Sequence, residues 1–391
     1  MRSYVERRRY PGCSVLIARD GREVFYAEEG LRDLAAGRPF TRDTVVRIFS
    51  MTKPIVSVAL MTLVEQGLFP LETPVSEFLP EFAHPRALVD EAERLDQAEP
   101  VHPPTLHQLL THTSGLSYSF NPGPVPRAMA EQAIEFKPRQ GPLADLVRRL
   151  AGLPLAFPPG RRWEYSVGID VIGRVIEVVT GKPLDAALDE IVLGPLGMSE
   201  TRFRLGEDQL ARFACLYTPL ADEPMALAGG VRGDDPLREI DRPETTPWRE
   251  TTTFSGGGGL VGTIDDYMRF CEMLRRGGSF GGARILSPAT LRFMMRNHLP
   301  GDIASMGPAS FAEQPMDGMG FGIGGAVVLD PARARIPGSE GDFSWGGMAS
   351  TFFWIDPRQK LSVVFFTQLS PSSSYPSRAE LKALVHGALL D

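Results

Sequence analysis

Cysteine is scarce in this 391-residue sequence. Cys13, Cys215 and Cys271 are odd in number, lie far apart and form no C-x-x-C pair. That pattern suits neither a disulfide framework nor a zinc site, so we expect three buried, reduced thiols. Reduced thiols are typical of a cytoplasmic protein.

A long hydrophobic run is also lacking. The longest, Ile55 to Val64, is interrupted by Ser57 and Thr62 and falls short of the ~20 residues that a membrane span needs. Residues 1–12 contain charges and a proline but no apolar core, so we expect no secretory signal there. The sequence therefore predicts a soluble chain with no membrane partner.

Strong basic charge is absent as well. The formal net charge is −7, and the short run Arg7-Arg8-Arg9 lies beside Glu6 with no basic continuation. We interpret this run as a solvated face, so no nucleic-acid partner is expected. The composition is 43% hydrophobic and 23% charged, as in globular proteins, and the length exceeds that of a usual single-core domain. We expect a two-lobed chain that acts as a monomer or a small homo-oligomer.

Strand patterns gather at the two chain ends. Apolar stretches flank Asp20-Gly21, a strong hairpin signal. Phe321 to Leu329, Ala349 to Ile355 and Leu361 to Thr367 also have strand composition. Helix signals are the apolar stretch from Ser50 to Gln66 closed by Gly67, a capping box at Thr105 and Gln108, a pattern from Ser166 to Thr180 closed by Gly181, the N-cap pair Ser287-Pro288, and a capping box at Ser377 and Glu380.

These elements predict an α+β fold. One antiparallel sheet is built from both chain ends and flanked by helices, with a mainly helical region inserted between them. We place the sheet domain at residues 1–80 and 250–391, and the helical domain at 81–249. Residues 218–250 are rich in Pro, Gly and charge, and we expect a long loop near an opening.

Ser50 and Lys53 carry the first chemical signal, within Phe49-Ser-Met-Thr-Lys-Pro54. Residues three apart share a helix face, so the two side chains can meet. Pro54 is tolerated only in a first turn, so the helix begins near Ser50, where its dipole stabilises a developing oxyanion. Apolar neighbours would partly desolvate Lys53, which favours a neutral amine that acts as a base. A capping hydroxyl beside a snorkelling lysine is the alternative.

Tyr165 supplies a second signal. It follows the turn Pro158-Pro159-Gly160 and precedes a helix, so we expect it on a loop tip. A tyrosinate beside Lys53 could take the proton of Ser50 and pass it to a leaving group. Taken alone, Tyr165 has the pattern of a half-buried loop residue.

The third signal is Ser344-Trp-Gly-Gly-Met348, which precedes an apolar strand. The paired glycines Gly346 and Gly347 would permit close approach of a substrate to the strand backbone. The backbone N–H of Met348, with that of Ser50, could form an oxyanion hole. A simple bulge before a strand is the alternative.

Together these motifs resemble the β-lactamase-like serine hydrolases, and most closely the family VIII carboxylesterases. The matching segments are S-x-x-K at Ser50 to Lys53, Tyr-Ser at 165–166, Trp-Gly-Gly at 345–347, Leu-Leu-Thr-His-Thr-Ser-Gly-Leu at 109–116 and Gly-Pro-Leu-Gly-Met at 194–198. The resemblance implies a β-lactamase/transpeptidase-like fold, with Ser50 as nucleophile, Lys53 and Tyr165 as the base pair, and no metal or cofactor.

Two departures from that family bear on the substrate. β-Lactamases carry an asparagine where Val167 stands and a lysine where Trp345 stands, and both groups help to hold a β-lactam. The resemblance therefore implies cleavage of short-chain carboxylic esters through an acyl-enzyme on Ser50. The alternatives are β-lactamase or D-amino-acid amidase or peptidase activity, or a penicillin-binding module with little turnover.

Other motifs are discounted. Ser279 lies in a G-x-S-x-G pattern, but a helix precedes it and a loop follows it, so we interpret it as a turn residue. Gly320, Gly322 and Gly325 lead into a strand rather than a helix, and residues 256–259 lack a P-loop lysine, which leaves a flexible loop.

The histidines give weaker signals. His112 is kept only as a weak alternative for a Ser-His-Asp triad and is expected to be structural. His102 and His107 are five apart and lie in no H-E-x-x-H context, so we expect no metal site.

Overall fold

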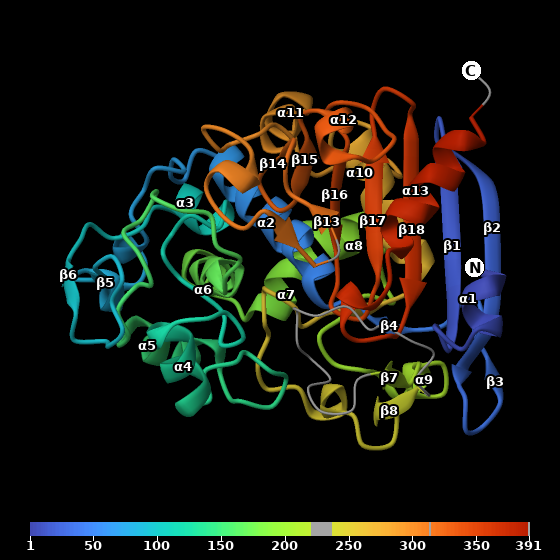
Figure 1. The fold of residues 1–391 in the computed structure, drawn as a ribbon, viewed down its shortest axis with the longest axis horizontal. Helices are drawn as coiled ribbons and strands as arrows, with labels where there is room; N and C mark the ends of the chain where they lie inside the picture. The colour runs from blue at the N-terminus through green and yellow to red at the C-terminus, as the bar shows by residue number, and fades with distance from the viewer. Residues whose placement is uncertain (220–236, 313, 390–391) are drawn as a thin grey trace.

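One antiparallel sheet organises the protein. The computed structural model describes residues 1–219, 237–312 and 314–389 (Figure 1). The sheet has eight strands in the order β14-β15-β16-β17-β18-β1-β2-β3. Its strands are β1 (Gly12–Arg19), β2 (Arg22–Asp33), β3 (Arg38–Pro39), β14 (Met319–Phe321), β15 (Ala326–Val328), β16 (Phe343–Gly346), β17 (Phe352–Asp356) and β18 (Leu361–Thr367). All eight come from the two chain ends, and every pairing is antiparallel, which confirms the predicted fold class.

Strand β18 explains why the segment from Leu361 to Thr367 is mostly apolar. Its residues are all buried, because β1 and β17 pair with it on either side and both faces of the sheet are covered. Val364 and Phe366 point into the main core, whereas Val363 and Phe365 join a second core on the opposite face. Successive side chains of a strand point to opposite faces, so β18 contributes apolar side chains to both cores.

Helices cover both faces of the sheet. The main core includes buried residues of α2 (Thr52–Glu65) and α10 (Ile264–Arg275). The second core includes Tyr4 of α1 (Arg2–Glu6) and Val385 of α13 (Ser377–Gly387), so the N-terminal and C-terminal helices share one face. Figure 1 shows α13 lying across the sheet on the side away from α10.

The inserted region gathers at the far end of the molecule from β1 and β2 (Figure 1). The elements at that end are β5 (Arg86–Leu88), β6 (Ala98–Pro100), α3 (Leu106–Leu110), α4 (Pro124–Glu131), α5 (Leu143–Ala151) and α6 (Gly168–Thr180), whereas α7 (Leu184–Leu188) and α8 (Gly194–Leu196) lie nearer the middle and α9 (Glu207–Leu210) lies on the side of β3. The capping box predicted at Thr105 and Gln108 is present, and Gly181 closes α6 in the left-handed conformation. Both local predictions are confirmed.

The remaining strands and α-helices are short. They are β4 (Val46–Arg47), β7 (Leu216–Thr218), β8 (Arg238–Asp241), β9 (Val261–Gly262), β10 (Ser279–Phe280), β11 (Ala283–Arg284), α11 (Pro288–Met294), β12 (Ser310–Phe311), β13 (Gln314–Pro315) and α12 (Pro331–Ala334). Ser287 caps α11 by accepting from the Thr290 N–H, as predicted. Part of the loop predicted at 218–250 lies outside the described residues, and the part described contains β8 and the 3₁₀ turn Pro247–Glu250.

Two predictions about elements were wrong. The single strand expected from Phe321 to Leu329 is the pair β14 and β15, because the glycine-rich turn between them reverses the chain, with the Gly322 N–H bonded to the Gly325 carbonyl. The capping box expected at the start of α13 is absent. Glu380 and Ser377 instead accept hydrogen bonds from the hydroxyls of Tyr4 and Tyr10, which tie α13 to the N-terminus.

The cysteine prediction is confirmed, because all three thiols are free and buried. Within the described ranges, no helix combines the length and apolar character that crossing a bilayer requires.

Candidate active site

Ser50 lies at the tip of a helix that is buried along most of its length. The 3₁₀ turn Phe49–Met51 runs directly into α2, and twelve consecutive residues of that helix, from Thr52 to Leu63, are buried. Ser50 itself remains half-buried and lines a cleft. The predicted place of the serine, over the positive end of the helix, is confirmed.

Lys53 lies one turn along and is almost fully buried, at 1% exposure. Its Nζ lies 3.2 Å from Ser50 Oγ, 2.9 Å from Tyr118 Oη and 2.6 Å from the Gly257 carbonyl oxygen. An ammonium group has three hydrogens to donate, and these three acceptors match them. The surroundings of Lys53 therefore suit its charged form in the resting state.

Tyr165 meets the same hydroxyl from a distant loop. Its Oη lies 2.6 Å from Ser50 Oγ, and the Lys53 ammonium lies 4.6 Å from the centre of its ring. The expectation of a loop-tip residue was wrong, because the ring is only 6% exposed. It packs against the rings of His112, Phe311 and Trp345, which hold it in one orientation.

Tyr118 is a site residue that the motif reasoning missed. Its hydroxyl accepts from Lys53, and its ring lies 5.1 Å from that of Tyr165. Burial, followed by the neighbouring Tyr165 and Asp170, raises the pKa of Tyr118 well above its ordinary value. Tyr118 therefore stays a neutral phenol. It lies two residues after the segment 109–116 that resembles the family, which was the available signal.

Asp170 and the glycine run 256–259 were also missed. Asp170, in the first turn of α6, accepts from the Ser255 hydroxyl at 2.5 Å and from the Gly257 N–H at 3.0 Å. The run is not the flexible loop that was expected. A Cβ on Gly256 would lie 2.5 Å from the Ile169 carbonyl, so this run packs directly on α6.

The end of β16 brings Met348 to the nucleophile. In the part of the chain that the structure describes, the Met348 N–H has no hydrogen-bond acceptor, and Met348 and Ser50 line the same cleft. The Ser50 N–H lies in the first turn of a helix, where backbone donors have no partner within the helix. Two N–H groups are thus available in this cleft.

The paired glycines Gly346 and Gly347 allow close packing of the protein backbone, in addition to any contact with a substrate. A Cβ on Gly347 would lie 2.4 Å from the Ile48 carbonyl oxygen, and one on Gly346 would lie 2.4 Å from the Arg378 guanidinium. Their absence of side chains lets β16 dock beside the turn that carries Ser50. Both glycines also line the cleft.

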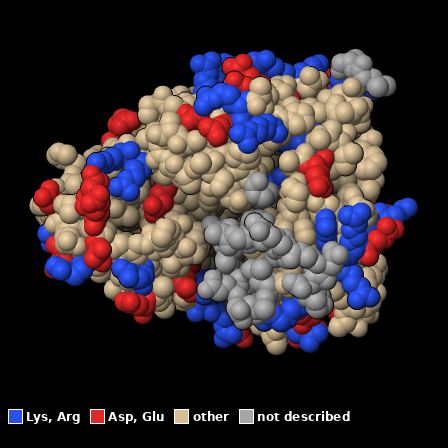
Figure 2. Space-filling model, in the orientation of Figure 1, with Lys and Arg blue, Asp and Glu red and all other residues tan. Residues whose placement is uncertain are grey.

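Trp345 forms an apolar wall of the cleft. Its ring stacks on Phe311 with centres 5.7 Å apart and meets Phe321 edge-on at 5.2 Å. The cleft has a volume of about 1090 Å³, and its described lining includes Ser50, Tyr165 and Trp345. On the face shown in Figure 2, acidic and basic side chains are interspersed, with stretches of uncharged surface between them.

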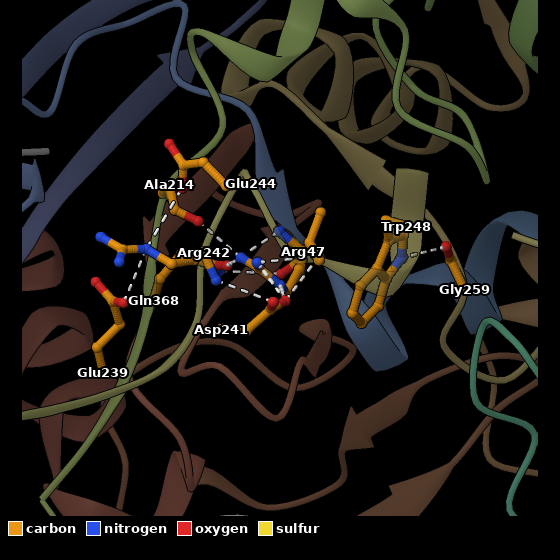
Figure 3. A network of polar contacts seen from close by, with 10 residues as sticks. Arg47, Ala214, Glu239, Asp241, Arg242, Glu244, Trp248, Gly259 and Gln368 are labelled. Atoms are coloured by element: carbon orange, nitrogen blue, oxygen red, sulfur yellow. Dashed lines mark hydrogen bonds and ion pairs between the residues drawn. The ribbon is translucent and has the colours of Figure 1, made fainter. Parts of the chain in front are cut away.

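A buried ion pair holds the strand before the nucleophile. Arg47, with no exposed surface, donates to Asp241 Oδ2 at 2.9 and 2.5 Å and to the Ala214 carbonyl at 2.8 Å (Figure 3). Burial lowers the pKa of Arg47, and Asp241 opposes that shift. Trp248 donates to the Gly259 carbonyl and packs edge-on against Phe49. The described part of the predicted loop therefore does border the cleft, as expected.

Among the described residues, none of the discounted motifs forms a hydrogen bond with Ser50. His112 is buried and bonds Ser166 Oγ at 3.1 Å, not Ser50, so its packing against Tyr165 is structural. Ser279 lies in strand β10, paired with Arg284 of β11, and not in the turn that was expected, because the turn of this hairpin is at residues 281–282. The glycines at 320, 322 and 325 lead into β15 and open no helix. His102 is exposed, and His107 pairs with His298.

The comparisons with known proteins agree with this site. The sequence model of the Beta-lactamase family matches residues 1–387. Esterase EstB of Burkholderia gladioli is 37% identical over 92% of this chain and 86% of its own length, and Protein Rv1367c of Mycobacterium tuberculosis is 39% identical over 90% and 84%. The solved structure of EstCE1, a hydrolase with promiscuous acyltransferase activity, superimposes with a TM-score of 0.80 at 31% identity, covering 98% of this chain and 96% of its own.

The fold and the site thus define a serine hydrolase of the β-lactamase type. The chain belongs to the Beta-lactamase family. Within that family its likeness to EstB and EstCE1 is consistent with the family VIII carboxylesterases that the motifs resemble.

Proposed function

We propose that this protein hydrolyses carboxylic esters through an acyl-enzyme on Ser50. The observation that carries the proposal is the position of Ser50 Oγ, which lies 2.6 Å from Tyr165 Oη and 3.2 Å from Lys53 Nζ at the wall of the cleft. In this position the phenol oxygen of Tyr165 can accept the proton of the Ser50 hydroxyl. The positive charge of Lys53 then stabilises the negative charge that results. The likeness to Esterase EstB and to the hydrolase EstCE1, each over more than nine-tenths of this chain, supports the same reaction.

Tyr165 acts as the general base in this proposal. Its phenolate, stabilised by Lys53, takes the Ser50 proton as Oγ attacks the ester carbonyl carbon. The tetrahedral intermediate places its oxyanion on the N–H groups of Ser50 and Met348. Tyr165 then gives the proton to the alkoxide, and the alcohol leaves. Lys53 is assigned the ammonium role in place of the neutral amine expected from the sequence, because its three hydrogens have three acceptors.

Water completes the cycle in the second half-reaction. Tyr165 takes a proton from a water molecule, the resulting hydroxide attacks the acyl carbon, and Ser50 leaves with the proton returned by Tyr165. The net reaction consumes one ester and one water and yields a carboxylic acid and an alcohol. No metal or cofactor takes part in these steps.

The lining of the cleft favours an ester with a short acyl chain over a β-lactam. Trp345 presents an apolar ring where β-lactamases carry a lysine, and it stacks on Phe311. Val167, which replaces their asparagine, has no exposed surface and is not among the described residues of the cleft wall. The groups that would hold a β-lactam amide and carboxylate are thus replaced by apolar ones.

The test is hydrolysis of p-nitrophenyl butyrate by the wild type and by Ser50→Ala, Lys53→Ala and Tyr165→Phe. Ser279→Ala is the matched control, because it removes the serine of the competing G-x-S-x-G pattern. We expect Ser50→Ala to lose activity and Ser279→Ala to keep it. Retained activity in Ser50→Ala, with loss in a His112 variant, would overturn the assignment.

Nitrocefin and a D-alanyl amide distinguish the alternative activities. Turnover of either at rates rivalling the ester would make the protein a β-lactamase or amidase. A single acylation of Ser50 without turnover, detected by intact-protein mass spectrometry, would make it a binding module.

A further inference from the structure

Behind Lys53 lies a buried carboxylate that the proposed reaction does not use directly. Asp170 is 1% exposed and lies in the first turn of α6. It does not bond Lys53. It bonds Ser255 and Gly257, and the Gly257 carbonyl in turn accepts from Lys53 Nζ at 2.6 Å. One residue of backbone therefore separates the carboxylate from the ammonium.

The glycine run has no room for side chains where it carries that carbonyl. A Cβ on Gly257 would lie 2.3 Å from Asp170 Oδ2, and one on Gly256 would lie 2.5 Å from the Ile169 carbonyl. The Gly259 N–H closes the turn by bonding the Ser255 carbonyl at 2.9 Å. Asp170 thus binds both ends of the segment from Ser255 to Gly257, because it accepts from the Ser255 hydroxyl and from the Gly257 N–H.

The arrangement costs folding free energy. Among the described residues Asp170 Oδ2 has no hydrogen-bond partner, and a buried carboxylate with a bare oxygen is unfavourable unless a charge compensates it. Burial raises the pKa of Asp170, and the Lys53 charge, followed by the bonds from Ser255 and Gly257, opposes this shift. A carboxylate that lowers the free energy of unfolding in this way is better explained by a role in the reaction at Ser50 and Lys53 than by a role in stability.

We infer that Asp170 is a positioning residue for the acyl-transfer reaction, which holds the Gly257 carbonyl on Lys53 and places a negative charge near Lys53 and Tyr165. This inference rests on the proposed function. It assigns Asp170 no contact with substrate. Its effect reaches the reacting atoms through Gly257 and Lys53.

The test compares Asp170→Asn with a matched control, Asp266→Asn. The asparagine keeps an oxygen that can accept from Ser255 and Gly257 but loses the charge. Asp266 is similarly buried and also accepts from one backbone N–H, that of Glu200, and one hydroxyl, that of Thr201, without touching Ser50, Lys53 or Tyr165. The two substitutions are therefore alike in size, burial and bonding.

We expect Asp170→Asn to lower kcat by about 10-fold or more with KM changed by less than about two-fold, because it misplaces a catalytic group, while the similar size of asparagine preserves the shape of the cleft wall to which Asp170 contributes. The kcat/KM profile should move to lower pH by about half a unit, because a nearby negative charge favours the protonated forms of both an ammonium and a phenol. Asp266→Asn should change neither.

A wild-type rate and an unshifted profile in Asp170→Asn, or equal effects in Asp266→Asn, would reduce Asp170 to a structural residue. If Asp170→Asn does not fold, Ser255→Ala decides the question. That variant keeps the charge but removes one of the two bonds by which Asp170 holds the segment from Ser255 to Gly257, so kcat should fall by roughly 3-fold or more with little change in KM, and a wild-type kcat would overturn the inference. Retained activity in Ser50→Ala, by contrast, would overturn the proposed function itself.

Discussion

The Gly347 Cα lies against the main-chain carbonyl of Ile48, so closely that a Cβ would lie 2.4 Å from that oxygen. Ile48 directly precedes the turn that carries Ser50, and Gly347 directly precedes Met348. The two proposed oxyanion donors therefore depend on one close backbone contact between β16 and the start of η1, the turn Phe49–Met51.

Gly347→Ala should reduce kcat for ester hydrolysis by roughly 10- to 1000-fold, because pushing the two segments apart misplaces one oxyanion donor. Steady-state kinetics with p-nitrophenyl butyrate measure the loss. Gly387→Ala in α13 is the control, since nothing lies within 4 Å of the added methyl group. Equal rates in Gly347→Ala and the wild type would contradict the proposed role of Met348.

The two active-site tyrosines should respond differently to loss of their hydroxyls. Tyr165→Phe should lower kcat/KM by about 100-fold or more, because it removes the proposed general base. Tyr118→Phe removes only one acceptor of Lys53, and we expect a smaller loss of roughly 10-fold. Each variant keeps its ring and its aromatic packing, so thermal melting serves as the folding control. A larger loss in Tyr118→Phe would transfer the base role to Tyr118.

His112 should make stability depend on pH. Burial, followed by the Lys53 charge, lowers the pKa of His112 well below its ordinary value, so the folded protein keeps it neutral. Below about pH 6.5 the unfolded chain binds a proton that the folded chain does not, and the free energy of unfolding falls by up to about 1.4 kcal/mol per pH unit.

Urea unfolding of the wild type and His112→Asn between pH 7.5 and about 5 tests this expectation. Asparagine tolerates the positive φ of 58° at this position, and the variant should show a flatter pH dependence. His84→Asn, at an exposed position, is the control. An equal change of slope in both variants would contradict a specific effect of His112.

The Arg47–Asp241 pair should contribute to stability through burial. Asp241→Asn leaves a guanidinium with no exposed surface facing a neutral amide, and removing one partner of a buried pair typically costs about 3 kcal/mol. Chemical denaturation measures this loss. The exposed pair of Arg94 and Asp96 gives the control, since Asp96→Asn should change stability little. Similar losses in the two variants would mean that burial does not govern the effect.

Local patterns were sufficient for much of the fold. The turn at Asp20-Gly21, the caps at Thr105 and Ser287 and the stop at Gly181 were predictable because each depends on a few adjacent residues. The capping box at Ser377 failed for the opposite reason. The hydroxyls of Tyr4 and Tyr10, far away in sequence, bond the two side chains that the local pattern assigns to the helix.

For the site, the sequence by itself determined the nucleophile and its nearest partner. Ser50 and Lys53 lie three residues apart on one helix, and the helix period alone brings them together. Local patterns suggested Tyr165 and Met348 only as one of two interpretations each, the family resemblance joined them to Ser50, and Trp345 came from that resemblance alone. Tyr118, Asp170 and Gly257 were not predicted at all, because no fixed spacing links them to Ser50.

Only the tertiary structure decided how Lys53 is held. Its three acceptors come from segments around residues 50, 118 and 257, and their convergence depends on the packing of the glycine run against α6. A sequence specifies neighbours along the chain through its periodicity, whereas contacts between distant segments form only when the whole core closes around them.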